Sequence, residues 1–291
     1  MKPSPSSRDA DLSGAQVGDL ELALELADAA AAVTLSAFGG RQHVRLKADA
    51  TPVTEVDAAA ENTIRGLIAE HRPNDGVLGE EGGLTPGTSG RVWVVDPIDG
   101  TRMFAEGIPL WTTLIALRLG DAVGGSIALG VADAPALGER YHAALGSGAW
   151  CNGRAVEVST VDRLDDSFVL HAALEEFTRP TGTGLDALQR VLAGARASRG
   201  IGDAWAHLLV ARGAAEALVE QGPCFEWDFA ATSLIVAEAG GQLTRLEGGP
   251  PVDGGHLLVT NGRVDDEVRA ALATPTKPGA PAVGPLRSKG G

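Results

Sequence analysis

An apolar strand that ends in two acids constrains this chain more than any other feature. The run from Val94 to Thr101 has the sequence Val-Val-Asp-Pro-Ile-Asp-Gly-Thr, so Asp96 and Asp99 stand where the strand breaks into a glycine turn. Buried strand ends seldom carry unpaired carboxylates. Gly100 and Thr101 follow with backbone N–H groups that can face an anion, which suits a divalent cation bridged to a phosphate. The run predicts a metal-dependent phosphoryl-transfer site.

Composition narrows the classes of partner. The chain has 291 residues, of which 44% are hydrophobic, so it can bury a sizeable core. The chain has 24 Lys and Arg residues and 38 Asp and Glu residues. The resulting formal charge of −14 disfavours nucleic acid and anionic membranes as partners. Cys151 and Cys224 suit neither a zinc site nor a disulfide scaffold, which favours a cytoplasmic location. No segment approaches the roughly 18 apolar residues of a membrane span, and no leader is expected.

The first half of the chain predicts helices on a largely antiparallel sheet. An alanine-rich helix is expected over residues 20–32, before Gly39 and Gly40. A second helix is expected from Thr54 to His71, because Thr54 and Asp57 have the spacing of a capping box. Strands are expected at residues 77–78, 92–95, 111–119, 123–131, 139–144 and 149–158.

The second half alternates strands and helices, which predicts an α/β unit. Strands are expected at 168–172, 195–199, 215–219, 242–246 and 256–260, and helices at 184–192, 203–212, 227–240 and 264–273. We therefore predict a metal-binding subdomain over residues 17–150 and an α/β subdomain over 151–273 that completes the site. The polar, Ser- and Pro-rich residues 1–16 and the Pro- and Gly-rich residues 274–291 are expected to be disordered.

Three further acids stand at the ends of elements. Glu80 follows an apolar strand and precedes a glycine turn, and Asp228 begins a helix in Phe-Glu-Trp-Asp. Each also has a simpler interpretation, since Glu80 suits a solvated turn and Asp228 an N-cap. Asp57 can cap its own helix, and a carboxylate fixed in that way can still orient a water.

Together these motifs resemble the inositol monophosphatase superfamily of metal-dependent phosphatases. The resemblance covers about residues 20–273, and its pieces are Thr-Pro-Val-Thr-Glu-Val-Asp at 51–57, Gly-Glu-Glu at 79–81, Asp-Pro-Ile-Asp-Gly-Thr at 96–101, Trp-Asp at 227–228 and Glu-Ala-Gly-Gly at 238–241. It implies an α/β (α+β) fold, the layered α-β-α-β-α sandwich of the inositol monophosphatase and fructose-1,6-bisphosphatase type. It also implies a homodimer that hydrolyses a small phosphorylated metabolite.

The resemblance assigns roles to single residues. Two or three Mg²⁺ ions would be held by Glu80, Asp96, Asp99, Asp228 and the backbone carbonyl of Ile98. The phosphate would be held by Gly100 and Thr101, and the attacking water would be polarised by Asp57 and Thr101, with Glu80 also taking part in catalysis. Because Mg²⁺ can activate water and neutralise phosphate oxygens, the hydrolysis needs no nucleophilic side chain.

The substrate contacts implied by the resemblance are Asp203, Ala204 and Glu220. One extra residue separates Glu220 from Asp228 relative to the family, so Gln221 is an alternative. Histidinol-phosphate phosphatases of the actinobacterial type resemble the chain more closely, because they share Gly-Asp at 202–203 and a run like Gly107 to Trp111. Histidinol phosphate carries an ammonium and an imidazole that Asp203 can pair with. Asp203 can equally cap the helix that starts there.

Other functions stay open at this point. Met103 replaces an Asn common in the family, and Gly82 with Gly83 is expected to make the loop after Glu81 loose. Both departures can reshape the pocket edge, which leaves an inositol-1-phosphate phosphatase or a phosphatase for a phosphorylated sugar or nucleoside of a specialised pathway as alternatives. A catalytically silent regulatory homologue is the alternative without enzymatic activity, and the complete set of acids argues against it.

Overall fold

The computed structural model describes residues 18–40, 45–46, 52–120, 125–179 and 184–273. The ends that we predict to be disordered, 1–16 and 274–291, lie outside these residues. The described part of the chain contains seven α-helices, which are α2 (Asp19–Ala37), α3 (Glu55–His71), α4 (Thr101–Ala105), α5 (Leu185–Gly194), α6 (Asp203–Ala211), α7 (Glu226–Glu238) and α8 (Asp265–Ala273). Two short 3-10 helices are η1 (Leu164–Asp166) and η2 (Glu176–Thr178).

The first large sheet has eight strands in the order β10-β9-β8-β7-β6-β5-β3-β4. Its neighbours pair antiparallel, except that β3 runs parallel to β5. The strands are β3 (Gly76–Gly79), β4 (Gly83–Thr85), β5 (Arg91–Asp99), β6 (Thr112–Leu119), β7 (Ser126–Ala134), β8 (Glu139–Ala144), β9 (Ala149–Cys151) and β10 (Arg154–Val156). A separate pair is formed by β1 (Arg45–Leu46) and β2 (Pro52–Val53).

The second large sheet has five strands in the order β12-β11-β13-β15-β14. The strands are β11 (Phe168–His171), β12 (Ala197–Gly200), β13 (Ala217–Cys224), β14 (Gln242–Arg245) and β15 (Gly255–Thr260). Strand β11 pairs in parallel with β12 and β13, and β15 pairs antiparallel with β13 and β14. The parallel part agrees with the predicted α/β unit.

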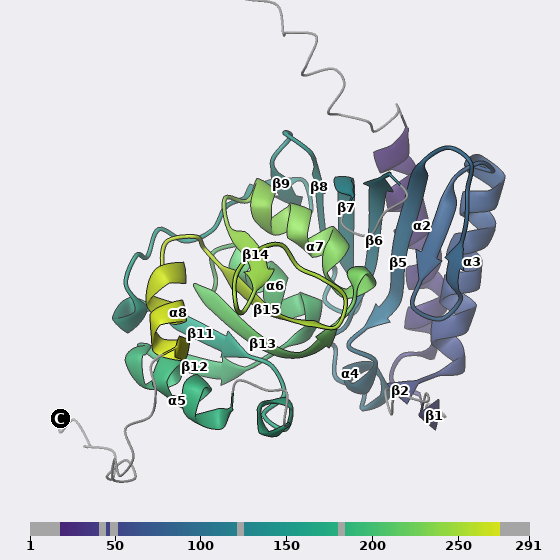
Figure 1. Cartoon of the computed structure of the whole chain (residues 1–291). Helices are drawn as coiled ribbons and strands as arrows, with labels where there is room; N and C mark the ends of the chain where they lie inside the picture. Colours follow the sequence, from purple (N-terminus) through teal and green to yellow (C-terminus); the bar gives the residue numbers. More distant parts are fainter. Residues whose placement is uncertain (1–17, 41–44, 47–51, 121–124, 180–183, 274–291) are drawn as a thin grey trace, which may run out of the picture.

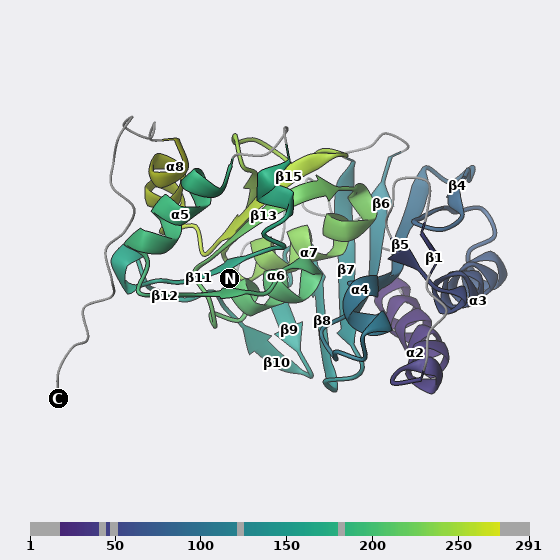
Figure 2. The ribbon, with the colours of Figure 1, turned by 90° about the horizontal axis from the view of Figure 1, so that it is seen from below.

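The helices form three layers that alternate with the two large sheets (Figures 1 and 2). Helices α2 and α3 cover one face of the first sheet, while α6 and α7 lie between the sheets and α5 and α8 cover the outer face of the second. The largest core cluster is the middle layer, where residues of α6 and α7 meet residues of both sheets. The predicted α-β-α-β-α sandwich is thereby confirmed. The division of the chain at residue 150 into two subdomains stays a prediction.

Strand β5 is buried along its whole length because helices cover both of its faces. Successive side chains of a strand point to opposite faces. Trp93 and Val95 therefore pack toward α2 and α3, whereas Val92 and Val94 pack toward α7. The same alternation directs Asp96 to the α7 side. It also explains why the strand is an unbroken apolar run in the sequence.

Several elements differ from their predicted bounds. Strand β5 extends through both acids to Asp99, with a register shift between Asp96 and Asp99, and the five-residue helix α4 follows it. The single strand expected over 149–158 is wrong: it is the hairpin β9–β10, which turns at Asn152 (φ 48°) and Gly153 (φ 75°). Asn-Gly is the favoured pair for such a tight turn. Residues 123–124 of the expected strand 123–131 lie outside the described residues, and β7 runs on to Ala134.

Candidate active site

Three predicted metal ligands meet at the end of β5. Asp96 and Asp99 end this strand, and Asp228 lies in the first turn of α7, which packs on the same face. One carboxylate oxygen from each acid lies within 4.8 Å of the other two. The backbone orients them, since Asp96 Oδ1 accepts the N–H of Ile98 at 3.0 Å and Asp228 Oδ2 accepts the N–H of Phe225 at 2.7 Å.

The third carboxylate is held by two other elements. Asp99 Oδ2 accepts the hydroxyl of Thr112, in β6, at 3.2 Å and the backbone N–H of Ala204, in α6, at 2.9 Å. The N-terminus of a helix is favourable for a carboxylate. Ala204, which we predict as a substrate contact, thus uses its backbone N–H to tie α6 to the acid cluster.

Glu80 lies beside this cluster. It follows β3 directly, and its backbone N–H donates to the carbonyl of Val95 at 3.2 Å. Since β3 runs parallel to β5 with Gly79 opposite Val95, the next residues along the two strands are Glu80 and Asp96. The charge of Glu80 is among the causes that raise the pKa of Asp96 and of Asp228. The structure therefore places Glu80 next to the three acids whose carboxylate oxygens meet.

The electrostatics of the cluster suit a cation. The pKa values of Asp96, Asp99 and Asp228 are raised well above the ordinary value, first by burial and further by the neighbouring carboxylates. A cation among them would remove this penalty. The side-chain donors are all carboxylate oxygens, which are the ligands that a hard ion such as Mg²⁺ prefers. The residues present fit the predicted metal site.

Asp57 combines the two roles that the sequence leaves open. Its Oδ2 caps α3 by accepting the N–H of Thr54 at 2.9 Å and the hydroxyl of Thr54 at 2.5 Å. Its Oδ1 lies 3.2 Å from the hydroxyl of Thr101, which also lies 3.0 Å from the carbonyl oxygen of Ile98. Asp57 is fully buried, and burial raises its pKa although the hydrogen bonds oppose the shift. The cap fixes a carboxylate beside the acid cluster.

The turn at Gly100 joins the cluster to the predicted substrate contacts. Gly100 has a φ of 81°, and a Cβ there would stand 3.1 Å from the carbonyl oxygen of Leu110 and 3.5 Å from Oδ2 of Asp203. The carboxylate of Asp203 therefore lies next to this turn. Gly100 and Thr101, the predicted phosphate-binding residues, stand at the beginning of α4.

Asp203 is the first residue of α6 and not its cap. The N-cap is Gly202, which has no side chain of its own to cap the helix. Instead Oε1 of Glu220 accepts the backbone N–H of Asp203 at 2.9 Å. Asp203 has a positive φ of 58°, and its pKa is raised to about 6, first by burial and then by the charge of Glu220.

A buried chain of polar contacts supports Glu220 from behind. Oε2 of Glu220 lies 2.6 Å from Nε2 of His207, whose Nδ1 lies 2.8 Å from the hydroxyl of Thr232. These contacts place Glu220 against Asp203, while Gln221 follows at the start of a bulge in β13. Direct contact of either residue with a substrate stays a prediction.

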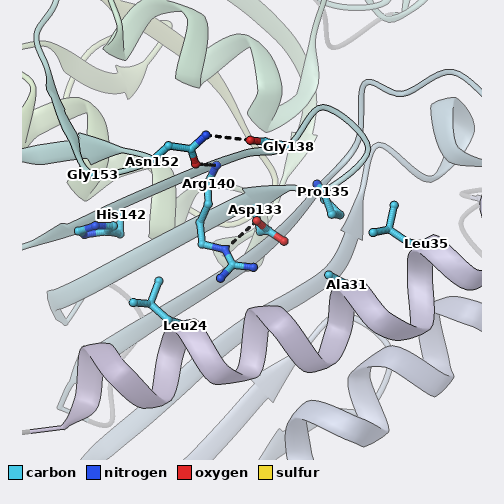
Figure 3. A pocket seen from close by; sticks show the side chains of 10 residues that line it. All are labelled: Leu24, Ala31, Leu35, Asp133, Pro135, Gly138, Arg140, His142, Asn152 and Gly153. Carbon is cyan, nitrogen blue, oxygen red and sulfur yellow. Dashed lines mark hydrogen bonds and ion pairs between the residues drawn. The ribbon is translucent and has the colours of Figure 1, made fainter.

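A hollow of about 490 Å³ lies on the α2 side of the first sheet, between α2 and strands β7 to β10 (Figure 3). Within it Asp133 accepts a hydrogen bond from Nε of Arg140 at 2.8 Å. None of the predicted site residues lines this hollow, whose lining is Leu24, Ala31, Leu35, Asp133, Pro135, Gly138, Arg140, His142, Asn152 and Gly153. The active-site prediction therefore rests on the acid cluster and not on the hollow.

Comparison with known proteins gives a match to the inositol monophosphatase family over residues 18–276. The chain belongs to this family. A histidinol-phosphatase from Streptomyces coelicolor is 41% identical over 264 residues, which span 87% of this chain and 96% of that protein. A histidinol-phosphatase from Chlorobaculum parvum is 43% identical over 256 residues and spans the same shares. The family predicted from the motifs is confirmed.

Solved structures agree with this assignment. The extragenic suppressor protein suhB from Bartonella henselae matches with a TM-score of 0.80 and 30% identity, covering 87% of this chain and 98% of that one. The family is metal-dependent, and its histidinol-phosphatases and inositol monophosphatases are phosphoric monoester hydrolases. The predicted enzyme class is confirmed at this level. No helix in the described ranges has both the length and the apolar character needed to cross a membrane.

Some residues at the site are not predicted from the sequence. His207 and Thr232 carry no motif, and only the fold brings them behind Glu220. Glu61 also contacts the loop of Glu80. It had a usable signal, because it lies four residues after Asp57 and thus on the same face of α3.

Proposed function

We propose that this protein is a Mg²⁺-dependent phosphatase that hydrolyses histidinol phosphate. The observation that carries the choice of substrate is Asp203. Its side chain is half-buried, its carboxylate lies beside the Gly100 turn, and it caps no helix. A half-buried acid with a raised pKa is stabilised by a cation. Histidinol phosphate offers an ammonium group, whereas inositol phosphate has none, and the names of the curated relatives support the same substrate.

The proposed chemistry uses the residues of the acid cluster. Mg²⁺, when bound by Glu80, Asp96, Asp99, Asp228 and the Ile98 carbonyl, would neutralise phosphate oxygens and lower the pKa of a water. Asp57 and Thr101 would orient this water, and the hydroxyl of Thr101 can pass a proton toward Asp57 Oδ1, 3.2 Å away. Backbone N–H groups at Gly100 and Thr101 would hold the phosphate at the start of α4.

The proposal includes the finer properties of the enzyme. We infer two or three Mg²⁺ ions per site, a homodimer and a cytoplasmic location. Cys151 and Cys224 are both free thiols, which supports a reducing compartment. Light scattering after size-exclusion chromatography tests the dimer, and anomalous scattering from crystals soaked in Mn²⁺ counts the ions.

The activity is tested by phosphate release with Mg²⁺ over a panel of substrates. The panel contains histidinol phosphate, inositol 1-phosphate, fructose 1,6-bisphosphate and nucleoside monophosphates. We expect the highest kcat/KM with histidinol phosphate. A preference for inositol 1-phosphate would contradict the proposed substrate but keep the phosphatase, and no hydrolysis of any member would favour a silent homologue.

The role of Asp203 is tested by Asp203→Asn. Asparagine tolerates the positive φ at this position and keeps the shape of the side chain, so only the charge is removed. We expect KM for histidinol phosphate to rise by roughly tenfold, the worth of one partly buried ion pair, and KM for inositol 1-phosphate to change little. Asp186→Asn is the matched control, because Asp186 is an acid in the first turn of α5. Equal changes for both substrates would contradict cation pairing.

A further inference from the structure

We propose that Glu61 is a positioning residue for the metal ligand Glu80. Its carboxylate fixes the loop after β3 from the α3 side, so that Glu80 is presented to Asp96 and Asp228 on the other side. The inference rests on the metal site of the proposed function and is independent of the substrate.

The carboxylate of Glu61 binds the backbone directly after Glu80. Its Oε2 accepts the N–H of Glu81 at 2.8 Å, and its Oε1 accepts the N–H of Gly82 at 2.9 Å. Glu61 is 2% exposed, so these bonds form away from water. Hydrogen bonds from backbone N–H groups to a buried carboxylate are strong. They fix the peptide that follows the metal ligand.

We call the contacts of Glu61 and Arg65 with the loop after β3 the clamp. Arg65 lies one turn after Glu61 in α3. Its Nε lies 2.6 Å from Oε1 of Glu61, and its other nitrogens donate to the carbonyl of Gly83 at 2.6 Å and the hydroxyl of Thr85 at 3.1 Å. The charge of Glu61 is thus balanced within the same helix. The loop predicted to be loose because of Gly82 and Gly83 is instead bound along its length.

Two glycines provide the space for the carboxylate. A Cβ at Gly79 would lie 2.4 Å from the carboxyl carbon of Glu61, and one at Gly82 would lie 2.8 Å from its Oε1. Both distances are too short for a side chain to coexist with Glu61 in this place. The Gly-Glu-Glu-Gly sequence therefore has a physical reason, since the glycines on either side of the acids make room for Glu61.

Strand alternation explains why the clamp acts on Glu80. Val77 packs on the α3 side of the first sheet and Leu78 on the α7 side. Gly79 accordingly faces α3, where it meets Glu61, and Glu80 turns to the α7 side, where the acid cluster lies. Glu61 binds the N–H of Glu81, the residue directly after Glu80, so a shift of the Glu61 carboxylate would also move Glu80.

The test measures Mg²⁺ binding to Glu61→Gln by isothermal titration calorimetry without substrate. Glutamine keeps one acceptor oxygen and replaces the other with an amide that cannot accept an N–H. We expect the dissociation constant for Mg²⁺ to rise by roughly 10- to 100-fold, as for other residues that orient metal ligands. A folded variant with the wild-type constant would overturn the proposal.

A matched control separates positioning from general stability. Asp19 is also a fully buried carboxylate, paired with Arg72 at 3.0 Å and Arg91 at 2.8 Å away from the acid cluster. Asp19→Asn should lower Tm and leave the Mg²⁺ constant unchanged. Weakening of Mg²⁺ binding by Asp19→Asn to the same degree would show a merely structural effect and overturn the proposal.

A second pair of variants leaves Glu61 intact. Gly82→Ala places a methyl group against Oε1 of Glu61 and should weaken Mg²⁺ binding. Gly66→Ala should not, because Gly66 lies in the same helix as Glu61 but has open space around it. Unchanged binding in Gly82→Ala would count against the clamp. Because the readout is metal binding, failure to hydrolyse histidinol phosphate would leave the result valid, while a wild type that binds no Mg²⁺ would overturn the metal site and the inference with it.

Discussion

Asp96, Asp99 and Asp228 are each costly to ionise where they lie, because they are buried together. A residue of this kind serves a ligand at the expense of the stability of the free protein. Asp57 differs, since its Oδ2 stabilises the start of α3 while its Oδ1 faces Thr101. At the residue scale, function and stability conflict at the first three acids, whereas at Asp57 the hydrogen bonds to Thr54 and Thr101 offset part of the cost of burial.

We predict that Asp96→Asn loses activity and gains stability without metal. The amide oxygen can still accept the N–H of Ile98, so the local backbone is kept. Activity should fall by on the order of 1000-fold, since a metal contributes several kcal/mol to such reactions. Tm measured in EDTA should rise, because one buried charge is gone. Phosphate release and thermal unfolding check both parts, and near-normal turnover with Mg²⁺ would reject the ligand assignment.

Asp203 predicts a pH dependence of specificity. Its pKa of about 6 means that it is charged at pH 7.5 and largely neutral at pH 5. The attraction for an ammonium group is lost as pH falls through 6, so the ratio of KM for histidinol phosphate to KM for inositol 1-phosphate should rise by up to about tenfold. Using the ratio removes the titration of the phosphate. The Asp203→Asn variant should show a much flatter ratio, and an equally steep one would exclude Asp203 as the cause.

At the scale of elements, a buried ion pair joins α7 to β6. Arg118 and Glu226 are in direct contact and each is 2% exposed. Glu226 lies two residues before Asp228, so this pair fixes the turn that carries a predicted metal ligand. We predict that Arg118→Met lowers the free energy of unfolding by about 3–5 kcal/mol, because the charge of Glu226 is left buried and unpaired.

Denaturant unfolding of the metal-free protein checks this value. The double variant Arg118→Met with Glu226→Leu should recover most of the loss, since no unpaired charge remains. A single variant that unfolds like the wild type would show that water reaches Glu226 and that the pair contributes little.

The elements also show what sequence can predict. The start of α3 can be predicted from its capping box. Strand β5 can be predicted from its unbroken apolar run, which is typical of a strand that is covered on both faces. The hairpin at Asn152 carried a local signal that the apolar pattern obscured. The partners of Glu61 and Glu220 could not be predicted, because hydrogen bonds between distant segments leave no local pattern.

At the scale of the whole molecule, the acid cluster links stability to pH and metal. An acid whose pKa is raised on folding binds more protons in the folded than in the unfolded state between the two pKa values. Stability of the metal-free protein therefore falls as pH rises above the unfolded value of 3.8, and the loss is complete above the raised values of Asp96, Asp99 and Asp228.

We predict that Mg²⁺ raises Tm more at pH 8 than at pH 5. At high pH all the acids are charged and bind the ion, whereas at low pH protons compete with it. Differential scanning fluorimetry with Mg²⁺ or EDTA checks this, and the variant Asp96→Asn with Asp228→Asn should show little effect of Mg²⁺ at either pH. An equal rise at both values would place the binding elsewhere.

The middle layer of α6 and α7 has a consequence for how the chain holds together. Asp96 and Asp99 come from the first sheet, while Asp228 comes from a helix that begins directly after β13 of the second. An ion bound by all three would act as a cross-link between segments more than 100 residues apart in the sequence. Hydrogen exchange should then slow in β13 and α7 when Mg²⁺ is added, although both elements are far in sequence from Asp96 and Asp99 of β5. The ion that serves the reaction would thus also stabilise the contact between the two sheets and the helices between them.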